Sequence, residues 1–351
     1  MIRMVILLVA LIGGTGAKAQ ELTDRIGPAD AARELRVRST TDLEVLRPVL
    51  ESFLETRPDT AILYEQWLSN SLYRRSIEEC EAGSPGADLV ISSAVHQLVE
   101  FVNRACAASY VSEVTAMLPS DLSWRDELWG ITREPAVIVY NRDLVPPEEV
   151  PRSRFDLLDT LRNAPERYSG RIATYDIEAS GLGFLFAYAD SLEATTFGGL
   201  LEAFGRTNAV ATCCSAEIMD AVSSGKYLIA YNILGSYAFG LAKRNPHLGI
   251  VAPSDYTLML SRGAVLPRGA RNRALAAQLV DYLLPPSGQD SLRQANLNTD
   301  LDALLEKGAV PEGFGASQLR SIELSPKLLV ASDRHKRLLF KEVWLNAFPE
   351  D

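Results

Sequence analysis

Three short loops rich in Ser, Thr and Gly lie where a strand signal gives way to a helix signal. They are Ser39–Thr41, Ser92–Ser93 and Ser180–Gly183. The first amides of a helix have no partner within the helix and carry a partial positive charge, so loops of this kind can bind an anion. In the third loop, Gly181 and Gly183 leave the backbone open to a close approach. The alternative is that each loop only caps its own helix.

Four other side chains have the chemistry to hold a small organic ligand. The guanidinium of Arg133 can clamp a carboxylate or phosphate with two hydrogen bonds, or it can simply pair with the neighbouring Glu134 on the surface. Trp67 and Tyr237 can wall a ligand, or they can be ordinary core aromatics. The amide of Asn232 can donate a hydrogen bond, or it can shape a turn.

The remaining reactive side chains show no catalytic or metal-binding spacing. The histidines His96, His247 and His335 are isolated along the chain, whereas metal sites usually combine several ligands at short spacing. No Gly-x-Ser-x-Gly motif of a serine nucleophile occurs. The sequence therefore predicts a protein that binds rather than one that catalyses, with no cofactor and no metal.

The first residues have the pattern of an export leader. Arg3 is followed by the apolar run 5–12 and by Ala17-Lys18-Ala19, a small-x-small cleavage pattern that leaves Gln20 as the mature start. The run is far shorter than the roughly 20 residues that span a bilayer. We expect a periplasmic protein cleaved after Ala19; the alternative is an uncleaved anchor.

The composition is that of a folded, acidic protein. The chain has 351 residues, 47% of them hydrophobic, which suffices for two domains with apolar cores and argues against disorder. Removing Arg3 and Lys18 with the leader leaves 33 basic against 45 acidic residues, a net charge of −12. Without clusters of Lys or Arg, such a chain is not expected to bind nucleic acid.

Export changes the interpretation of the four cysteines, because disulfides persist outside the cytoplasm. Cys80 and Cys106 flank an expected strand and can meet in space, so we predict a disulfide between them. A bond between the adjacent Cys213 and Cys214 is less favourable. The alternative is four buried thiols.

Strand and helix signals alternate along the mature chain. The expected strands are 35–38, 60–64, 88–92, 136–140, 171–175, 227–231, 249–252 and 257–266. The expected helices are 43–54, 70–80, 95–104, 180–189, 272–284, a segment after 287, and 327–346. This alternation predicts an α/β fold with mainly parallel sheets, in which ligands bind beyond the carboxyl ends of the strands.

Six stretches, in this order, resemble the type 2 periplasmic solute-binding proteins of ABC importers, nearest to the branch that binds iron(III) and phosphoesters. They are Arg38–Asp42, Ala87–Ser93, Glu134–Asn141, Ala179–Gly183, Tyr231–Tyr237 and Ser287–Gln289. Each is weak alone; together they span about residues 34–295.

The resemblance implies two α/β lobes around a cleft. The first lobe would take 20–131 and 249–351, and the second 132–248. The cleft would close on its ligand by a hinge motion, and the closed form would dock on an ABC permease. We expect a monomer in this role. The alternative is a sensor component that presents the ligand to a histidine kinase.

The ligand implied is a small organic anion, either a carboxylate or a phosphorylated compound. Iron-binding relatives hold Fe(III) with two adjacent tyrosines, whereas the corresponding stretch here, Asn232–Tyr237, has only one near its end. An iron(III)-binding protein is therefore the alternative. The expected ligand-binding residues are Ser39, Thr40, Thr41, Trp67, Ser69, Ser92, Ser93, Arg133, Ser180, Gly181, Leu182, Gly183, Asn232 and Tyr237.

Overall fold

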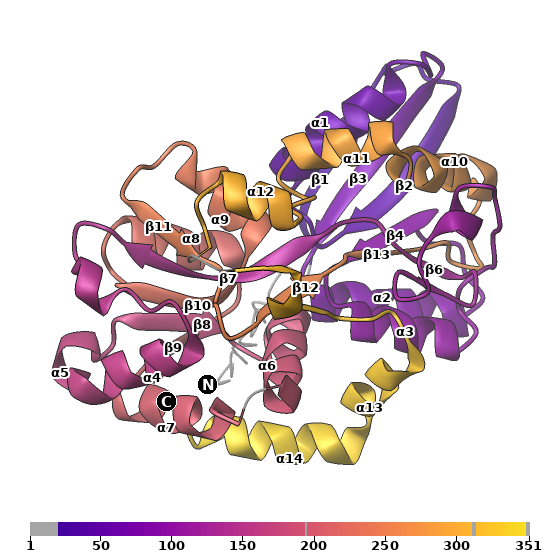
Figure 1. The fold of residues 1–351 in the computed structure, drawn as a ribbon. Helices are drawn as coiled ribbons and strands as arrows, with labels where there is room; N and C mark the ends of the chain where they lie inside the picture. The colour runs from indigo at the N-terminus through magenta and orange to yellow at the C-terminus, as the bar shows by residue number, and fades with distance from the viewer. Residues whose placement is uncertain (1–19, 194, 311–313, 349–351) are drawn as a thin grey trace, which may run out of the picture.

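The computed structural model describes residues 20–193, 195–310 and 314–348, and the expected leader 1–19 lies outside them. These residues form two seven-stranded sheets, each with helices around it (Figure 1). The predicted two-lobed α/β fold is confirmed. The first sheet lies in the upper right of Figure 1 and the second in the lower left.

The first sheet combines a parallel centre with antiparallel strands on both sides. β2 runs parallel to β3 and β4, whereas β1, β13, β6 and β5 pair antiparallel. In sheet order the strands are β1 (Gln20–Ile26), β3 (Thr60–Trp67), β2 (Arg33–Ser39), β4 (Leu89–Ser92), β13 (Gly263–Val265), β6 (Leu128–Gly130) and β5 (Ser123–Trp124).

The second sheet is mixed as well. β8 runs parallel to β9 and β10, and β12 to β14, while β7 pairs antiparallel with β10, β11 and β12. The strands are β14 (Leu319–Ser321), β12 (Thr257–Leu260), β7 (Glu134–Asn141), β10 (Ile229–Leu234), β8 (Ile172–Tyr175) and β9 (Val210–Thr212), with β11 (Leu248–Val251) on β7. Both sheets are thus mixed rather than mainly parallel. The strands on either side of the crossings, such as β6, β7, β12 and β13, each pair antiparallel with at least one neighbour in the sheets.

Along the strand order the chain passes between the two sheets three times: after β6, between β12 and β13, and between β13 and β14. The first two of these crossings lie side by side. It leaves the first sheet after Gly130 and returns between Leu260 and Gly263. The amide of Ile131 donates to the carbonyl of Arg262 (2.9 Å), which joins the crossings. If the lobes are divided according to the sheets, the chain returns to the first lobe at residues 261–262. The lobe limits 20–131, 132–248 and 249–351 stay a prediction.

Helices cover the sheets because each has one apolar face. In α1 the buried residues have the helical spacing expected from the sequence: Leu43, Leu46, Val49, Leu50, Phe53 and Leu54. Around the first sheet are α1 (Leu43–Leu54), α2 (Ser69–Glu81), α3 (Val95–Asn103), α10 (Arg273–Leu283) and α11 (Pro286–Gln294). Around the second are α4 (Arg154–Asn163), α5 (Pro165–Tyr168), α6 (Gly181–Glu193), α7 (Phe197–Arg206), α8 (Ser215–Ser223) and α9 (Gly235–Ala242), with α12 (Leu301–Glu306) after α11.

The C-terminal segment touches both lobes. The single helix expected over 327–346 is divided into α13 (Leu329–Ser332) and α14 (Arg334–Leu345), because Asp333 accepts a hydrogen bond from the amide of Lys336 (3.0 Å) and caps the second helix. α13 contacts α3 of the first lobe. On α14, Phe340 packs against the rings of Phe184 and Phe197 of the second lobe. In Figure 1 this segment runs along the lower edge of the molecule.

Both cysteine pairs are disulfides. Cys80 at the end of α2 is bonded to Cys106 after α3, which confirms the predicted pair. Cys213 and Cys214 are bonded to each other as well, against expectation. The turn from β9 into α8 brings these neighbouring sulfurs together.

Candidate functional site

A cavity lies between the lobes at the carboxyl ends of strands from both sheets. It encloses about 720 Å³ when the open solvent at its mouth is counted. Its walls follow β2, β3 and β4 on one side and β8, β9 and β10 on the other, where parallel sheets bind ligands. The first side contributes Glu21, Thr40, Asp42, Gln66, Trp67, Leu68, Ser69 and Ser93; the second contributes Tyr175, Ala179, Ser180, Leu182, Cys213, Cys214, Ser215, Ala216, Leu234 and Tyr237; and Arg262 comes from the second crossing.

Half of the expected ligand-binding residues line this cavity. They are Thr40, Trp67, Ser69, Ser93, Ser180, Leu182 and Tyr237. The others, which do not line it, are Ser39, Thr41, Ser92, Arg133, Gly181, Gly183 and Asn232.

The hydroxyls of the first two loops cap their own backbone. The Ser39 hydroxyl accepts from the Thr41 amide (3.0 Å), and the Ser92 hydroxyl accepts from the Ala94 amide (3.1 Å). The Thr40 hydroxyl accepts from the Ser93 amide (3.0 Å), so the two loops also bind each other. The amides that we expected to face an anion are therefore occupied by the protein.

The third loop is occupied in the same way. The Ser180 hydroxyl accepts from the Gly183 amide (3.0 Å), and the Ser69 hydroxyl of the first lobe accepts from the Gly181 amide (2.8 Å). The Asn70 side chain also donates to the carbonyl of Glu178 (2.6 Å). This loop is thus a point of contact between the lobes rather than an open anion site.

Three other helix starts face the cavity without a side-chain cap. They belong to α2, α8 and α9, which begin after Leu68, Cys214 and Leu234. Their first amides carry the partial positive charge of a helix start. Sequence reasoning named Ser69 and Tyr237 but did not identify these three helix starts as anion sites. The reason is that Leu68, Cys214 and Leu234 at the N-cap positions are not typical capping residues.

Arg133 does not take the part expected of it. Its side chain is exposed, and its backbone pairs with the segment at Asn298. Its expected alternative partner, Glu134, is buried and bonded instead to Arg262, whose Nε and Nη2 donate to its two carboxylate oxygens (2.8 and 3.1 Å). The reason is geometric, since consecutive strand residues point to opposite faces.

Arg262 is the guanidinium that sequence reasoning missed. It is only 1% exposed, and its Nη1 donates to the Thr41 hydroxyl (2.9 Å), which ties the second crossing to the start of α1. It lies in the expected strand 257–266, where Ser261-Arg262-Gly263 separates two apolar runs. Interpreting these residues as one strand hid the point at which the chain changes sheets.

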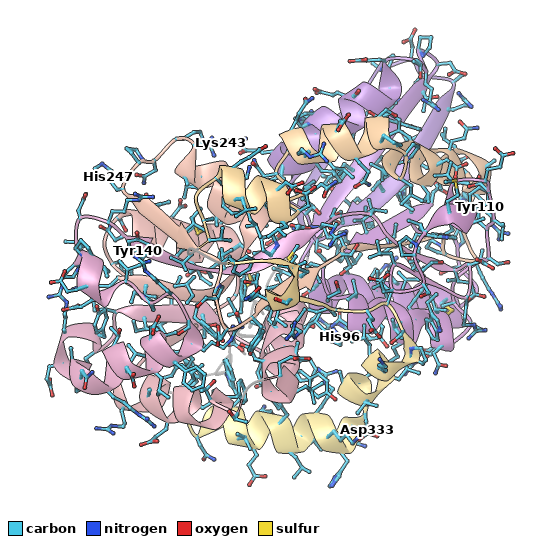
Figure 2. The ribbon with its side chains drawn as sticks, viewed as in Figure 1. His96, Tyr110, Tyr140, Lys243, His247 and Asp333 are labelled. Carbon is cyan, nitrogen blue, oxygen red and sulfur yellow. A yellow bond between two sulfur atoms is a disulfide. The ribbon has the colours of Figure 1, made fainter. Side chains whose placement is uncertain are left out.

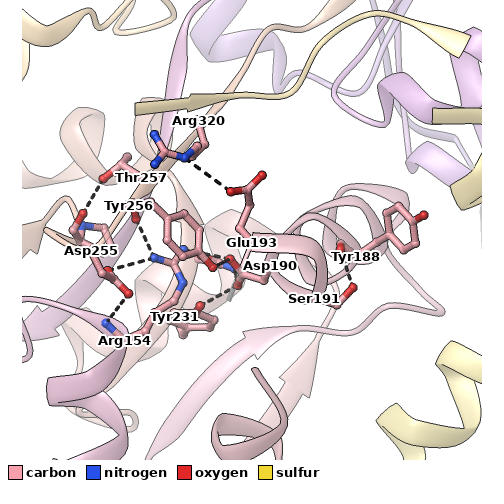
Figure 3. Close-up of polar contacts among 12 residues, drawn as sticks. Arg154, Tyr188, Asp190, Ser191, Glu193, Tyr231, Asp255, Tyr256, Thr257 and Arg320 are labelled. Carbon is pink, nitrogen blue, oxygen red and sulfur yellow. Dashed lines mark hydrogen bonds and ion pairs between the residues drawn. The ribbon is translucent and has the colours of Figure 1, made fainter. Parts of the chain in front are cut away.

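Asn232 belongs to a buried polar cluster away from the cavity. Its side-chain amide donates to Asp190 (2.5 Å), which also accepts from Arg154 (2.9 Å), Tyr231 (2.6 Å) and Tyr256 (2.7 Å) (Figure 3). Asn232 has a φ of 58°, at an irregularity in the pairing of β10 with β7. Of the two roles considered for Asn232, binding a ligand and shaping a turn, its positive φ fits the turn.

Two carboxylates stand on the wall of the first lobe. One side chain, that of Gln66, donates both to Asp42 and to Glu21 (3.1 Å each). Burial raises the pKa of the Asp42 carboxyl, and a hydrogen bond with the Tyr237 phenol and the nearby charge of Arg262 oppose this shift only in part.

Two phenols lie in the same cavity. Tyr175 shares a hydrogen bond with Ser215 (2.6 Å), and Tyr237 accepts one from the amide of Asp42 (3.3 Å) across the lobes. Burial raises the pKa of Tyr175 to about 12 and that of Tyr237 further. Both phenols are therefore protonated at neutral pH and can donate hydrogen bonds to a ligand.

The histidines do not gather at this site. Figure 2 shows His96 inside the molecule and His247 on the outer edge of the second lobe. Over residues 20–193, 195–310 and 314–348, no group of three or more His, Cys, Asp or Glu side chains could hold a metal ion. Within the same part of the chain, the helices are too short or too polar to cross a membrane.

The fold and part of the sequence match proteins of known class. The family described as bacterial extracellular solute-binding protein matches residues 84–312. The structure of the substrate binding protein of an ABC transporter from Agrobacterium tumefaciens has 32% sequence identity and a TM-score of 0.85, over 93% of this chain and 98% of that one. No curated protein sequence matches the chain.

Two more distant structures share the fold. Iron-bound HitA from Pseudomonas aeruginosa has 19% identity and a TM-score of 0.67, over 88% of this chain and 99% of that one. AfuA from Actinobacillus pleuropneumoniae, with fructose-6-phosphate bound, has 14% identity and a TM-score of 0.69, over 92% and 100%. The family match and the Agrobacterium structure show that the chain belongs to the bacterial extracellular solute-binding proteins.

Proposed function

We propose that this protein is the periplasmic component of an ABC importer, which captures a small organic anion between its lobes and delivers it to the permease. The anionic group would be a carboxylate or a phosphate. It would bind at the starts of α2, α8 and α9, and the hydroxyls of Ser180 and Ser215 would add hydrogen bonds.

The observation that carries this proposal is the cavity's position. It lies at the carboxyl ends of strands from both sheets, and three uncapped helix starts, one from the first lobe and two from the second, line it. Because both lobes supply these donors, an anion between them would favour the closed arrangement. The proposed anion site therefore differs from the Ser- and Gly-rich loops expected from the sequence, whose amides are occupied. It uses the same kind of donor, the backbone amides at helix starts.

Two further observations support this function. The apolar run and cleavage pattern over 1–19 are those of an export leader, which fits a periplasmic protein. AfuA, which shares the fold, was solved with a sugar phosphate, so phosphorylated compounds belong in the first screen.

Iron(III) is the second candidate, because Tyr175 and Tyr237 both line the cavity although they are far apart in sequence. HitA, with the same fold, was solved with iron. Burial raises the pKa of both phenols, so releasing their protons to give Fe(III) anionic oxygen ligands would cost more than at an exposed tyrosine.

The experiment is a thermal melting screen of the mature protein with carboxylates, sugar phosphates, phosphonates and iron(III) citrate, followed by calorimetry. A ligand of the folded state raises the melting temperature by mass action. Stabilisation by a class of organic anion supports the proposal. Stabilisation by iron(III) alone would contradict it.

Ala216→Asp tests the place of binding. Ala216 is exposed on the cavity wall at the start of α8. An aspartate there favours the helix by about 0.3–1 kcal/mol but repels an anion at the same amides. We expect at least about a tenfold loss of anion affinity with unchanged or higher thermal stability. Ser224→Asp, at the exposed opposite end of α8, is the matched control and should bind as wild type does.

A partner pull-down would separate import from sensing, because both roles use the closed lobes. Recovery of a permease supports import, whereas recovery of a histidine kinase would favour a sensor component.

A further inference from the structure

Asp42 is a carboxylate on the cavity wall without a cationic partner. Its side chain is half-buried and forms no ion pair with any described residue. The neutral amide of Gln66 donates to it at 3.1 Å. A partly desolvated carboxylate without a cation is costly unless something compensates for it.

Arg262 cannot be that partner, although it lines the same cavity. It is buried and already holds both oxygens of Glu134, and its third contact goes to Thr41. The ion pair with Glu134 offsets much of the charge of the guanidinium, although Arg262 still favours the charged form of Asp42. Asp42 and Glu21 therefore leave the wall of the first lobe negative.

The second lobe presents the opposite polarity. The uncapped start of α8 at Ser215 and Ala216 offers partial positive charge. A simple anion would fit this wall but would meet repulsion from Asp42 on the other. A solute with separated charges would satisfy both walls at once.

We propose that the solute is zwitterionic, with its anionic group at the start of α8 and a positively charged group at Asp42. This rests on the proposed function and narrows its ligand class. The rings of Trp67 and Tyr237 also line the cavity. The guanidinium of Arg38 already lies over Trp67, 5.5 Å from the ring centroid, so Tyr237 is the ring that could add a contact to a cation. Such a solute would bridge the lobes and so couple its own binding to their closure.

The experiment compares two matched pairs by calorimetry: butyrate with 4-aminobutyrate, and ethyl phosphate with phosphoethanolamine. In each pair the second compound adds an ammonium group at neutral pH. The wild-type protein should bind the amino compound at least about tenfold more tightly, since charge pairs in a desolvated site contribute that much or more.

Asp42→Asn assigns the effect to this carboxylate. It should abolish the preference for the amino compounds and leave the affinity for butyrate and ethyl phosphate equal or higher. Glu44→Gln, an exposed change on the same helix outside the cavity, is the control and should keep the preference.

Equal binding within each pair, unaffected by Asp42→Asn, would overturn the inference and leave the proposed anion function standing. Failure of all four compounds to bind at millimolar concentration, while the broader anion screen succeeds, would also overturn it. Failure of both experiments would reject the proposed function itself.

Discussion

Gly181 lies where the two lobes touch, and its missing side chain sets how near they can come. A Cβ at this position would meet Gln97 Nε2 at 2.8 Å, Ala94 Cβ at 2.9 Å and Asn70 Oδ1 at 3.1 Å, all from the first lobe. These distances are shorter than normal contacts, so a methyl group would push the lobes apart. Within the second lobe, α6 itself would tolerate alanine well.

Gly181→Ala is therefore expected to weaken solute binding without unfolding the protein. We expect about a tenfold or greater loss of affinity in calorimetry and a larger radius of gyration with solute in small-angle scattering. Gly198→Ala is the matched control, because it lies on α7 with open space around it. It should stabilise the fold by about 0.5–1 kcal/mol and leave affinity unchanged. Wild-type affinity in Gly181→Ala would show that the contact does not limit closure.

At the scale of single residues, the sequence predicted the type of binding chemistry better than it predicted which residues supply it. Thr40, Ser69 and Ser180 do line the cavity. The amides around them are used for capping and lobe contact, however, and no composition pattern distinguishes an amide that is capped from one that is free. Arg262 could not be selected over Arg133, because only the three-dimensional pairing shows which one faces the cleft.

At the scale of elements, the two disulfides have different roles. Cys80–Cys106 joins α2 to the end of α3 across 26 residues, whereas Cys213–Cys214 joins neighbours at the start of α8 and lines the cavity. In the chain-entropy view, stabilisation grows with the length of the closed loop. The first bond should therefore act on the fold and the second on the site.

Paired serine substitutions test this division. Cys80→Ser with Cys106→Ser should lower the free energy of unfolding by about 3 kcal/mol, with little change in affinity. Cys213→Ser with Cys214→Ser should have the reverse pattern: a small change in stability and an altered solute affinity. Urea unfolding and calorimetry measure the two quantities. Equal effects of both double variants on affinity would contradict the assignment.

α3 and α6 meet at a buried histidine. His96 packs against Phe184, with ring centroids 5.3 Å apart, and neither of its ring nitrogens has a hydrogen-bond partner among the described residues. Burial, and to a smaller extent the charge of Arg337 on α14, lower the pKa of His96 to about 3. The imidazole of His96 is therefore neutral when it is buried in the contact between the lobes.

Stability should fall on acidification for this reason. Between pH 6.5 and about 3 the unfolded chain binds a proton at this site and the folded one does not. The contribution of the buried neutral His96 to the free energy of unfolding is complete above pH 6.5. It is lost as the pH falls, by at most about 1.4 kcal/mol per pH unit. His96→Phe should show a shallower loss in urea unfolding across this range. His335→Gln, at an exposed histidine of α14, should follow the wild type; a curve for His96→Phe that also follows it would refute the role.

On the scale of the whole molecule, the alternation of strand and helix signals predicted an α/β fold, and the resemblance to solute-binding proteins implied its two lobes. The first lobe limit, after residue 131, stays a prediction; the chain leaves the first sheet after Gly130. The return crossing was not predicted, because the interpretation of 257–266 as one strand passed over Ser261-Arg262-Gly263, which interrupts its apolar pattern. The uncapped starts of α2, α8 and α9 could not be predicted either. A helix start is usually recognised by a capping residue, and these three helices have none.

The C-terminal segment adds a second link between the lobes, apart from the paired crossings. α13 contacts α3 on the first lobe, α14 packs on the second, and Asp333 alone separates them. One extended residue spans only about 3.5 Å, so the lobes cannot move far apart at this edge while both helices stay in place. Two such fixed points define a line, and any widening of the cleft must then be a rotation about that line, greatest at the side farthest from the tail.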